Sequence, residues 1–193
     1  MSSEVPTIPH HIIELCSACV SKEAPTGDAK APFGGVNWRV DASKAANAVF
    51  QLTTWFVKSV ATLTVAPGPI QFIEVTVKGW RAVLSTLEAI REEMKPLPYC
   101  AYVVLSSSPQ GLTHAELQQR LSNYVNEMIS SKWPLPWIGL SKDELTTACK
   151  ALSYSGQLDD LIRALIKSDY AEEKDGHVFY RSKNFSLGFT QRS

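Results

Sequence analysis

The sequence predicts a mostly helical protein of the α+β class, with a small β-hairpin after its last helix. Three observations support this prediction: apolar residues recur at helical spacing along most of the chain, two capping-box motifs mark helix starts in its second half, and Asp175-Gly176 matches a two-residue hairpin turn. The chain has 193 residues, of which 45% are hydrophobic and 20% charged, so it has the composition of a globular protein that buries a substantial core.

The first forty residues are predicted to hold one short helix and one short strand. Apolar residues on one stripe predict a helix from Pro9 to about Val20. Residues 21–35 contain two prolines and three glycines, so they are expected to form a loop. Residues 36–40 (VNWRV) alternate between apolar and polar side chains, which indicates a strand.

Two long helices are predicted next, over residues 43–64 and 69–95. Ser43 is placed to cap the first helix, and an Ala-Pro-Gly-Pro run separates the two. Residues 70–77 (IQFIEVTV) are rich in β-branched residues, and apolar and polar side chains alternate along them. A strand that runs into a shorter helix is therefore the second possibility there. The apolar faces of both helices are a predicted surface for self-association into a homo-oligomer.

Lys95-Pro-Leu-Pro98 is the expected boundary within the chain, because two prolines at this spacing favour an extended link. It divides the chain into a helical region over residues 1–95, which contains the long helical hairpin, and a second region over residues 97–193. The N-terminal region is expected to pack on the C-terminal one.

The elements of the second region are shorter. An apolar segment covers residues 99–107, and Thr113 and Glu116 form a capping box at the start of a helix that ends near Ser130. A second capping box, Ser141 to Glu144, begins a helix that passes through Leu152 and ends at Gly156. Residues 158–168 are predicted to form a third helix. The segments 170–174 and 177–181 flank the hairpin turn.

This order of elements resembles a winged-helix domain. The similarity is carried by residues 101–105 (first helix), 112–121 (second helix), 158–166 (third helix) and 170–180 (the wing). The chain departs from the family pattern because about 27 residues, with an additional helix, separate Ser130 from Leu158. The resemblance implies either DNA binding, with the third helix in the major groove, or a domain that contacts proteins.

If the domain bound DNA, the protein would be a transcriptional regulator. The charges of the third helix disfavour this alternative. Asp159 and Asp160 occupy its first turn, where they would meet phosphates with like charge. Both halves of the chain are neutral, with nine residues of each sign in residues 1–100 and ten in residues 101–193. The cations left as candidate contacts, to DNA or to a protein, are Arg163, Lys167, Arg181 and Lys183.

The sequence contains few residues in patterns that bind a metal or a cofactor or that carry out catalysis. Cys16 and Cys19 follow His10 and His11, but a fourth zinc ligand is missing nearby, so both cysteines are interpreted as packing residues. There is no glycine-rich phosphate loop, and no motif pairs a histidine with a nucleophile. We therefore expect a non-enzymatic protein with no metal site, no cofactor and no catalytic residues.

The most favoured function is an interaction or assembly module built on the winged-helix-like region. Trp133 and Trp137 lie in a loop stiffened by prolines and are candidate anchors of a protein interface, or alternatively cover the N-terminal helices. A cytoplasmic location is expected, because four cysteines do not form a disulfide scaffold and no secretory signal is recognisable. No membrane span is expected either, since Asn47, Gln51 and Lys58 interrupt the apolar run over residues 45–65.

Overall fold

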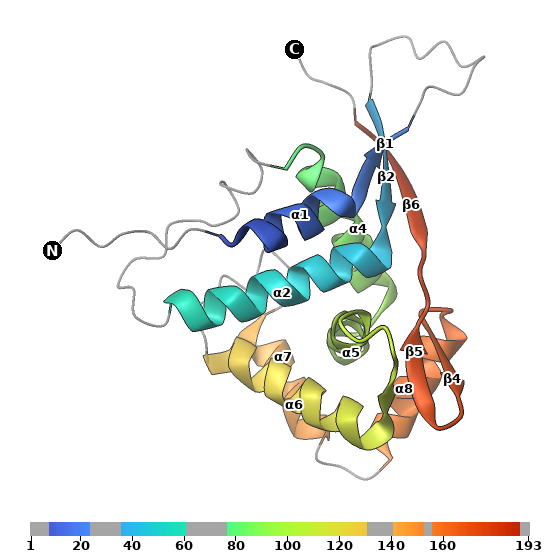
Figure 1. Cartoon of the computed structure of the whole chain (residues 1–193). Helices are drawn as coiled ribbons and strands as arrows, with labels where there is room; N and C mark the ends of the chain where they lie inside the picture. The colour runs from blue at the N-terminus through green and yellow to red at the C-terminus, as the bar shows by residue number, and fades with distance from the viewer. Residues whose placement is uncertain (1–7, 24–35, 61–76, 131–140, 153–155, 190–193) are drawn as a thin grey trace, which may run out of the picture.

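Seven helices and two small antiparallel sheets make up the part of the chain that the computed structural model describes, which is residues 8–23, 36–60, 77–130, 141–152 and 156–189 (Figure 1). The predicted fold class, mostly α with a small β component, is confirmed. The helices are α1 (His10–Ala18), α2 (Ala42–Val60), α4 (Trp80–Glu93), α5 (Pro96–Ser106), α6 (His114–Ser130), α7 (Lys142–Leu152) and α8 (Gln157–Lys167). The strands are β1 (Val20–Lys22), β2 (Val36–Asp41), β3 (Leu112–Thr113), β4 (Ala171–Lys174), β5 (His177–Tyr180) and β6 (Asn184–Phe189).

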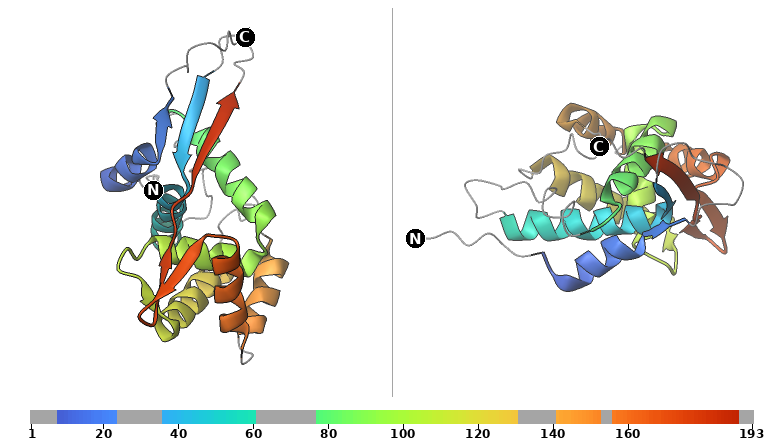
Figure 2. Two further views of the ribbon diagram at one scale, coloured as in Figure 1. Left: turned by 90° about the vertical axis from the view of Figure 1, so that its right-hand side faces the viewer. Right: turned by 90° about the horizontal axis from the view of Figure 1, so that it is seen from above.

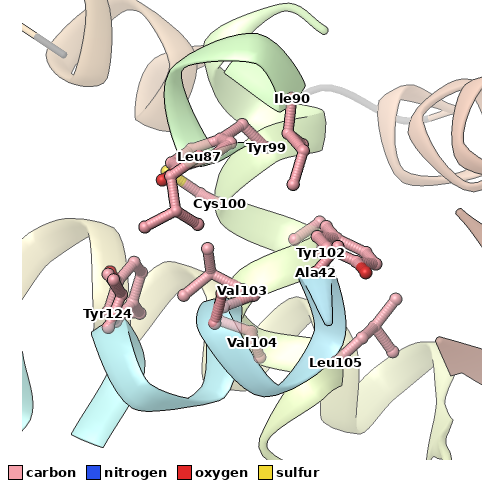
Figure 3. Close-up of a cluster of buried hydrophobic side chains, with 14 of the residues drawn as sticks. Ala42, Leu87, Ile90, Tyr99, Cys100, Tyr102, Val103, Val104, Leu105 and Tyr124 are labelled. Carbon is pink, nitrogen blue, oxygen red and sulfur yellow. The ribbon is translucent and has the colours of Figure 1, made fainter. Parts of the chain in front are cut away.

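Helix α5 is the centre of the molecule, and α2, α4, α6, α7 and α8 pack around it. It is apolar on all sides, as a fully surrounded helix requires, and its residues Tyr99 to Ser106 are all buried. Figure 3 shows how this helix meets its neighbours: Leu87 and Ile90 of α4 and Tyr124 of α6 point toward the side chains of α5. One hydrophobic cluster therefore joins helices from both halves of the chain.

Helix α2 confirms the helix predicted over residues 43–64 as far as Val60, where the described residues end. Its cap is Asp41 rather than Ser43, because the carboxylate of Asp41 accepts hydrogen bonds from the backbone amides of Ser43 and Lys44 at 3.0 and 3.1 Å. Burial opposes the ionisation of Asp41, but hydrogen bonds from Ser43, Lys44 and Ser182 outweigh it and lower the pKa of this carboxyl group.

Helix α4 begins at Trp80, so the prediction of one helix over residues 69–95 is wrong for residues 77–79, which form a bend and a turn. The question of strand or helix over residues 70–77 falls, apart from Val77, outside the described residues. Gly79 ends the turn at a φ of +85°, and a Cβ atom on it would lie 2.8 Å from the Trp38 ring. The positive φ and the close packing against Trp38 therefore both favour glycine at the position that directly precedes the helix.

The apolar faces of α2 and α4 are buried inside the chain. The α2 residues Val49, Leu52 and Phe56 and the α4 residues Val83 and Leu87 are each at most 2% exposed. Where these helices are described, their main apolar stripes therefore pack against the protein's own core. No described helix is both long enough and apolar enough to cross a membrane.

The link at residues 95–98 differs from the prediction of an extended boundary. Only Lys95 is extended, as a residue before proline prefers, and α5 begins at Pro96. Proline fits the first turn of a helix, because the amide that it lacks would have no partner within the helix. The two prolines therefore start the central helix.

One sheet, which we call sheet A, joins the two ends of the sequence. Its strand order is β1-β2-β6, and Val40 of β2 pairs with Phe185 of β6 (Figure 2). The predicted strand over residues 36–40 is confirmed, whereas β6 was not predicted. Val20, expected at the end of the first helix, lies instead in β1.

The second sheet, which we call sheet B, contains the predicted hairpin and has the order β3-β5-β4. Asp175 and Gly176 both have positive φ, at 51° and 73°, as a primed two-residue turn requires. Both capping boxes are confirmed, since the backbone amides of Thr113 and Ser141 each donate to the glutamate three residues later at 2.9 Å.

Two details of the second half correct the predictions. Gly156, expected to end the helix that passes through Leu152, instead directly precedes α8. The spacing of Leu158, Leu161, Ile162, Leu165 and Ile166 predicts an apolar stripe that faces the core. Leu161, Ile162 and Leu165 are buried and Leu158 is partly buried, but Ile166 is 39% exposed. The position of Ile166 at the edge of the stripe allows it to face either the core or the solvent. In the structure the helix is oriented so that Ile166 lies beside the buried stripe rather than in it.

Candidate functional site

The cations proposed as binding residues lie on or close to α8, but three of the four are engaged within the protein. Arg163 is exposed on α8 and forms an ion pair with Asp160 at 2.7 Å. Lys167 is exposed one turn further along the same helix. The other two proposed residues, Trp133 and Trp137, lie outside the described residues.

Arg181 and Lys183 contact the segment that connects α8 to β4. Arg181 pairs with Asp169 and lies 3.6 Å from a carboxylate oxygen of Glu172. The ammonium group of Lys183 donates to the carbonyl oxygen of Ser168 at 2.8 Å and lies 3.8 Å from the centre of the Tyr170 ring. Both side chains are therefore engaged within the protein, although only the charge of Arg181 is offset by carboxylates.

The histidine contacts do not include a nucleophile. His114 lies between two carboxylates, with its ring nitrogens 3.6 Å from Asp159 and 3.0 Å from Glu173, and so joins α6 to α8 and β4. His177 contacts a backbone carbonyl in the hairpin turn, and His10 pairs with Glu14. In the described part of the chain, no serine or cysteine side chain is hydrogen-bonded to an imidazole.

Cys16 and Cys19 are buried at the end of α1, at 1% and 2% exposure. The thiol of Cys19 donates to the carbonyl oxygen of Cys16 at 2.8 Å, and burial raises the pKa of Cys16 to about 12. Their position in the core agrees with the packing role predicted for them. Within the described ranges, no three or more His, Cys, Asp or Glu side chains are arranged to hold a metal ion.

The described residues form a groove of about 970 Å³ between the α4–α5 junction, α7 and α8. Helix α8 and its C-cap Ser168 contribute residues spaced by three and four positions from Gln157 onward, so the groove follows that helix for roughly 16 Å at 1.5 Å per residue. Its apolar lining includes Met94, Leu97, Leu161, Ala164 and Leu165. In the left view of Figure 2, the lower end of α4 lies near α7 and α8.

Four carboxylates and one ammonium group line this groove. The carboxylates belong to Glu93, Asp143, Glu144 and Asp160, and the ammonium group to Lys95. We call these four carboxylates the acidic rim. These four carboxylates come from three separate helices, so their convergence depends on how those helices pack and no residue spacing reveals it.

Hydrogen bonds fix two members of the acidic rim. Glu93 accepts a hydrogen bond of 2.5 Å from the hydroxyl of Tyr170. Burial and the neighbouring Glu93 raise the pKa of Tyr170, so the phenol stays protonated and continues to donate. The carboxylate of Glu144 accepts a hydrogen bond from the backbone amide of Ser141 at 2.9 Å, and this bond, followed by the Ser141 hydroxyl, lowers the pKa of the carboxyl group. Glu144 is therefore ionised at neutral pH.

The chain was compared with models of protein families, with curated proteins and with solved structures, and none of the three comparisons found a match.

Proposed function

We propose that this protein is a non-catalytic interaction module, in which a winged-helix-like C-terminal region binds a partner protein. We also place it in the cytoplasm, since its four cysteines are free thiols. The order α5, β3, α6, α8, β4, β5 and the sheet order β3-β5-β4 support the resemblance to winged-helix domains, with α7 as the additional helix.

The observation that carries the proposal is the engagement of the cations around α8. A protein that grips DNA needs lysine and arginine free to contact phosphates. Here Arg163, Arg181 and Lys183 are occupied by carboxylates, a carbonyl oxygen and a tyrosine ring, while Asp159 and Asp160 remain in the first turn of α8. The groove beside α8 offers instead an apolar surface with charged edges, which is typical of protein interfaces.

A second copy of this chain is a less favoured partner. The self-association predicted through residues 43–64 and 69–95 needs apolar surface on α2 and α4, but the described apolar stripes of both helices are buried in the core. Measurement of the mass in solution tests this point: a monomer of 21.3 kDa is expected, and a stable dimer would restore self-association as the primary role.

The deciding experiment must distinguish protein binding from DNA binding, which is the alternative function. A pool of random duplexes is taken through repeated selection on the protein, and the retained duplexes are measured by fluorescence anisotropy. We expect no enriched motif, and no dissociation constant tighter than the non-specific range of about 10⁻⁴–10⁻⁶ M at physiological salt.

The variant Asp159→Asn, Asp160→Asn makes this test directional. Removal of two negative charges from α8 is expected to strengthen the weak attachment to DNA. Glu127→Gln, which removes one exposed negative charge from α6, serves as a control and is expected to have a smaller effect. An enriched motif that is bound at nanomolar protein and lost in the double variant would overturn the proposal and establish a transcriptional regulator.

A further inference from the structure

We propose that the groove between the α4–α5 junction, α7 and α8 binds a basic, amphipathic peptide segment of a partner protein. This inference rests on the proposed function and specifies the site and the chemical class of its ligand. Its support comes from the shape of the groove, from its charge and from the small number of free amides at its α5 end.

The shape of the groove favours a chain segment over a compact molecule. The volume of about 970 Å³ lies at the upper end of the range for small-molecule sites. The lining residues of α8 extend over the full helix, so the groove is roughly 16 Å long. A peptide that places apolar side chains against the exposed Ala164 and the accessible edges of Met94 and Leu97, at 9% and 8% exposure, would use this groove.

The charge of the lining favours a cationic ligand. Four carboxylates face one ammonium group, so the lining residues carry a formal charge of −3. Arg163 offsets Asp160, and Arg91 lies close enough to lower the pKa of Glu144. Asp143 forms no ion pair with another described residue, and the partner of Glu93 is the neutral hydroxyl of Tyr170. Lysine or arginine on a peptide would therefore find uncompensated carboxylates at the edges.

The α5 end of the groove offers few backbone amides to an anion. A helix N-terminus normally presents free amides to a phosphate or carboxylate. In α5, however, Pro96 and Pro98 have no amide hydrogen, and the amide of Tyr99 donates to the carbonyl oxygen of Lys95. A nucleotide or an acidic peptide would find only the amide of Leu97 and the ammonium group of Lys95 as donors here, within a lining of net negative charge.

The test uses the full chain and three displayed peptide libraries. All three contain Leu, Ile and Phe at anchor positions, and the remaining positions carry Lys and Arg, Ser and Gln, or Asp and Glu. We expect binders from the basic library only, with an affinity that falls as salt is added.

Two groove variants, each with a matched control, locate the binding site. Asp143→Lys reverses a rim charge and is expected to weaken binding about tenfold or more, while Glu88→Lys, an exposed reversal on α4, leaves it within about twofold. Ala164→Trp fills the groove and is expected to abolish binding, while Gln118→Trp on the exposed side of α6 does not. Circular dichroism establishes that each variant is folded.

The outcomes separate the inference from the proposed function. Basic peptides that bind equally well to Asp143→Lys and Ala164→Trp would overturn the groove as the site but leave an interaction module. Equal selection from the neutral or acidic library, or no binder from any library, would overturn the inference. A specific DNA motif in the duplex selection would instead overturn the proposed function.

Discussion

Tyr170 shows how single side chains connect the groove to the hairpin. Its hydroxyl holds Glu93 at the groove, its ring packs edge-on against Tyr102 with centroids 5.1 Å apart, and its face carries the ammonium group of Lys183. Lys183 was predicted from sequence as a candidate binding residue. Its ammonium group is already engaged because the chain reverses after α8, where Asp169 takes a positive φ of 61°. The spacing of residues in the sequence does not reveal this reversal.

We predict that Gly79→Ala destabilises the protein more than Gly176→Ala. Both glycines have positive φ, so each alanine costs on the order of 1 kcal/mol in backbone strain. Only at Gly79 does the new Cβ atom also lie 2.8 Å from Trp38, whereas no atom lies within 4 Å at Gly176. Chemical denaturation measures the two free energies of unfolding, and equal losses would show that the contact with Trp38 is relaxed without cost.

A second comparison tests the orientation of α8. Leu165 is 1% exposed and Ile166 is 39% exposed, although the two are neighbours in sequence. We predict that Leu165→Ala lowers the free energy of unfolding by about 2–5 kcal/mol, and Ile166→Ala by at most about 1 kcal/mol. The same denaturation experiment measures both. A larger loss for Ile166→Ala would mean that the helix is rotated toward the stripe predicted from sequence.

Among the elements, those that depend on local contacts were the most predictable from sequence. Both capping boxes and the Asp175-Gly176 turn are correct, because their partners lie within three residues of each other. The start of α4 was placed too early, because it depends on a distant contact of Gly79 with Trp38. The groove was not foreseen for the same reason, since its walls come from three helices whose packing is not local.

The capping box of α6 makes a pH-dependent contribution to stability. A hydrogen bond from the backbone amide of Thr113, followed by its side-chain hydroxyl, lowers the pKa of Glu116 below the ordinary value of 4.5. A depressed pKa stabilises the fold above the unfolded value, and this contribution is lost as the pH falls through the folded-state pKa.

We predict that Thr113→Val raises the pKa of Glu116 only part of the way to its ordinary value, because the backbone bond, the larger cause, remains. Titration by NMR measures this pKa in both proteins. The pKa of Glu144, in the equivalent capping box of α7, is expected to be unchanged and serves as the internal control. A full return of the Glu116 pKa to 4.5 would show that the backbone bond contributes nothing.

For the whole molecule, sheet A and the shared core join the regions 1–95 and 97–193. Strand β2 pairs along its whole length with β6, and α2 and α4 both pack on α5. The sequence indicated that the two regions pack together but not that they share a sheet. The segment over 184–189 (NFSLGF) did not stand out as a strand, because its partner lies more than a hundred residues away in the sequence.

We predict that residues 97–193 expressed alone do not fold cooperatively. Without the N-terminal region, β6 loses its only described strand partner, and α5 exposes the side chains that α2 and α4 cover. Thermal unfolding followed by circular dichroism is expected to show one sharp transition for the full chain and none for the fragment. A fragment that melts sharply near the temperature of the full chain would establish two independent domains.

The pairing of Val36 with Phe189 also constrains the order of folding. The β4–β5 hairpin closes a two-residue turn, but the β2–β6 pair must close the loop between Asp41 and Asn184, which holds about three quarters of the chain. Each doubling of loop length adds about 0.6 kcal/mol to the entropic cost. Sheet A should therefore complete late, after the helices around α5 have brought its strands close together. During synthesis, β2 exposes an unpaired edge until the residues of β6 emerge, so this edge is where a newly made chain is most exposed to pairing with another.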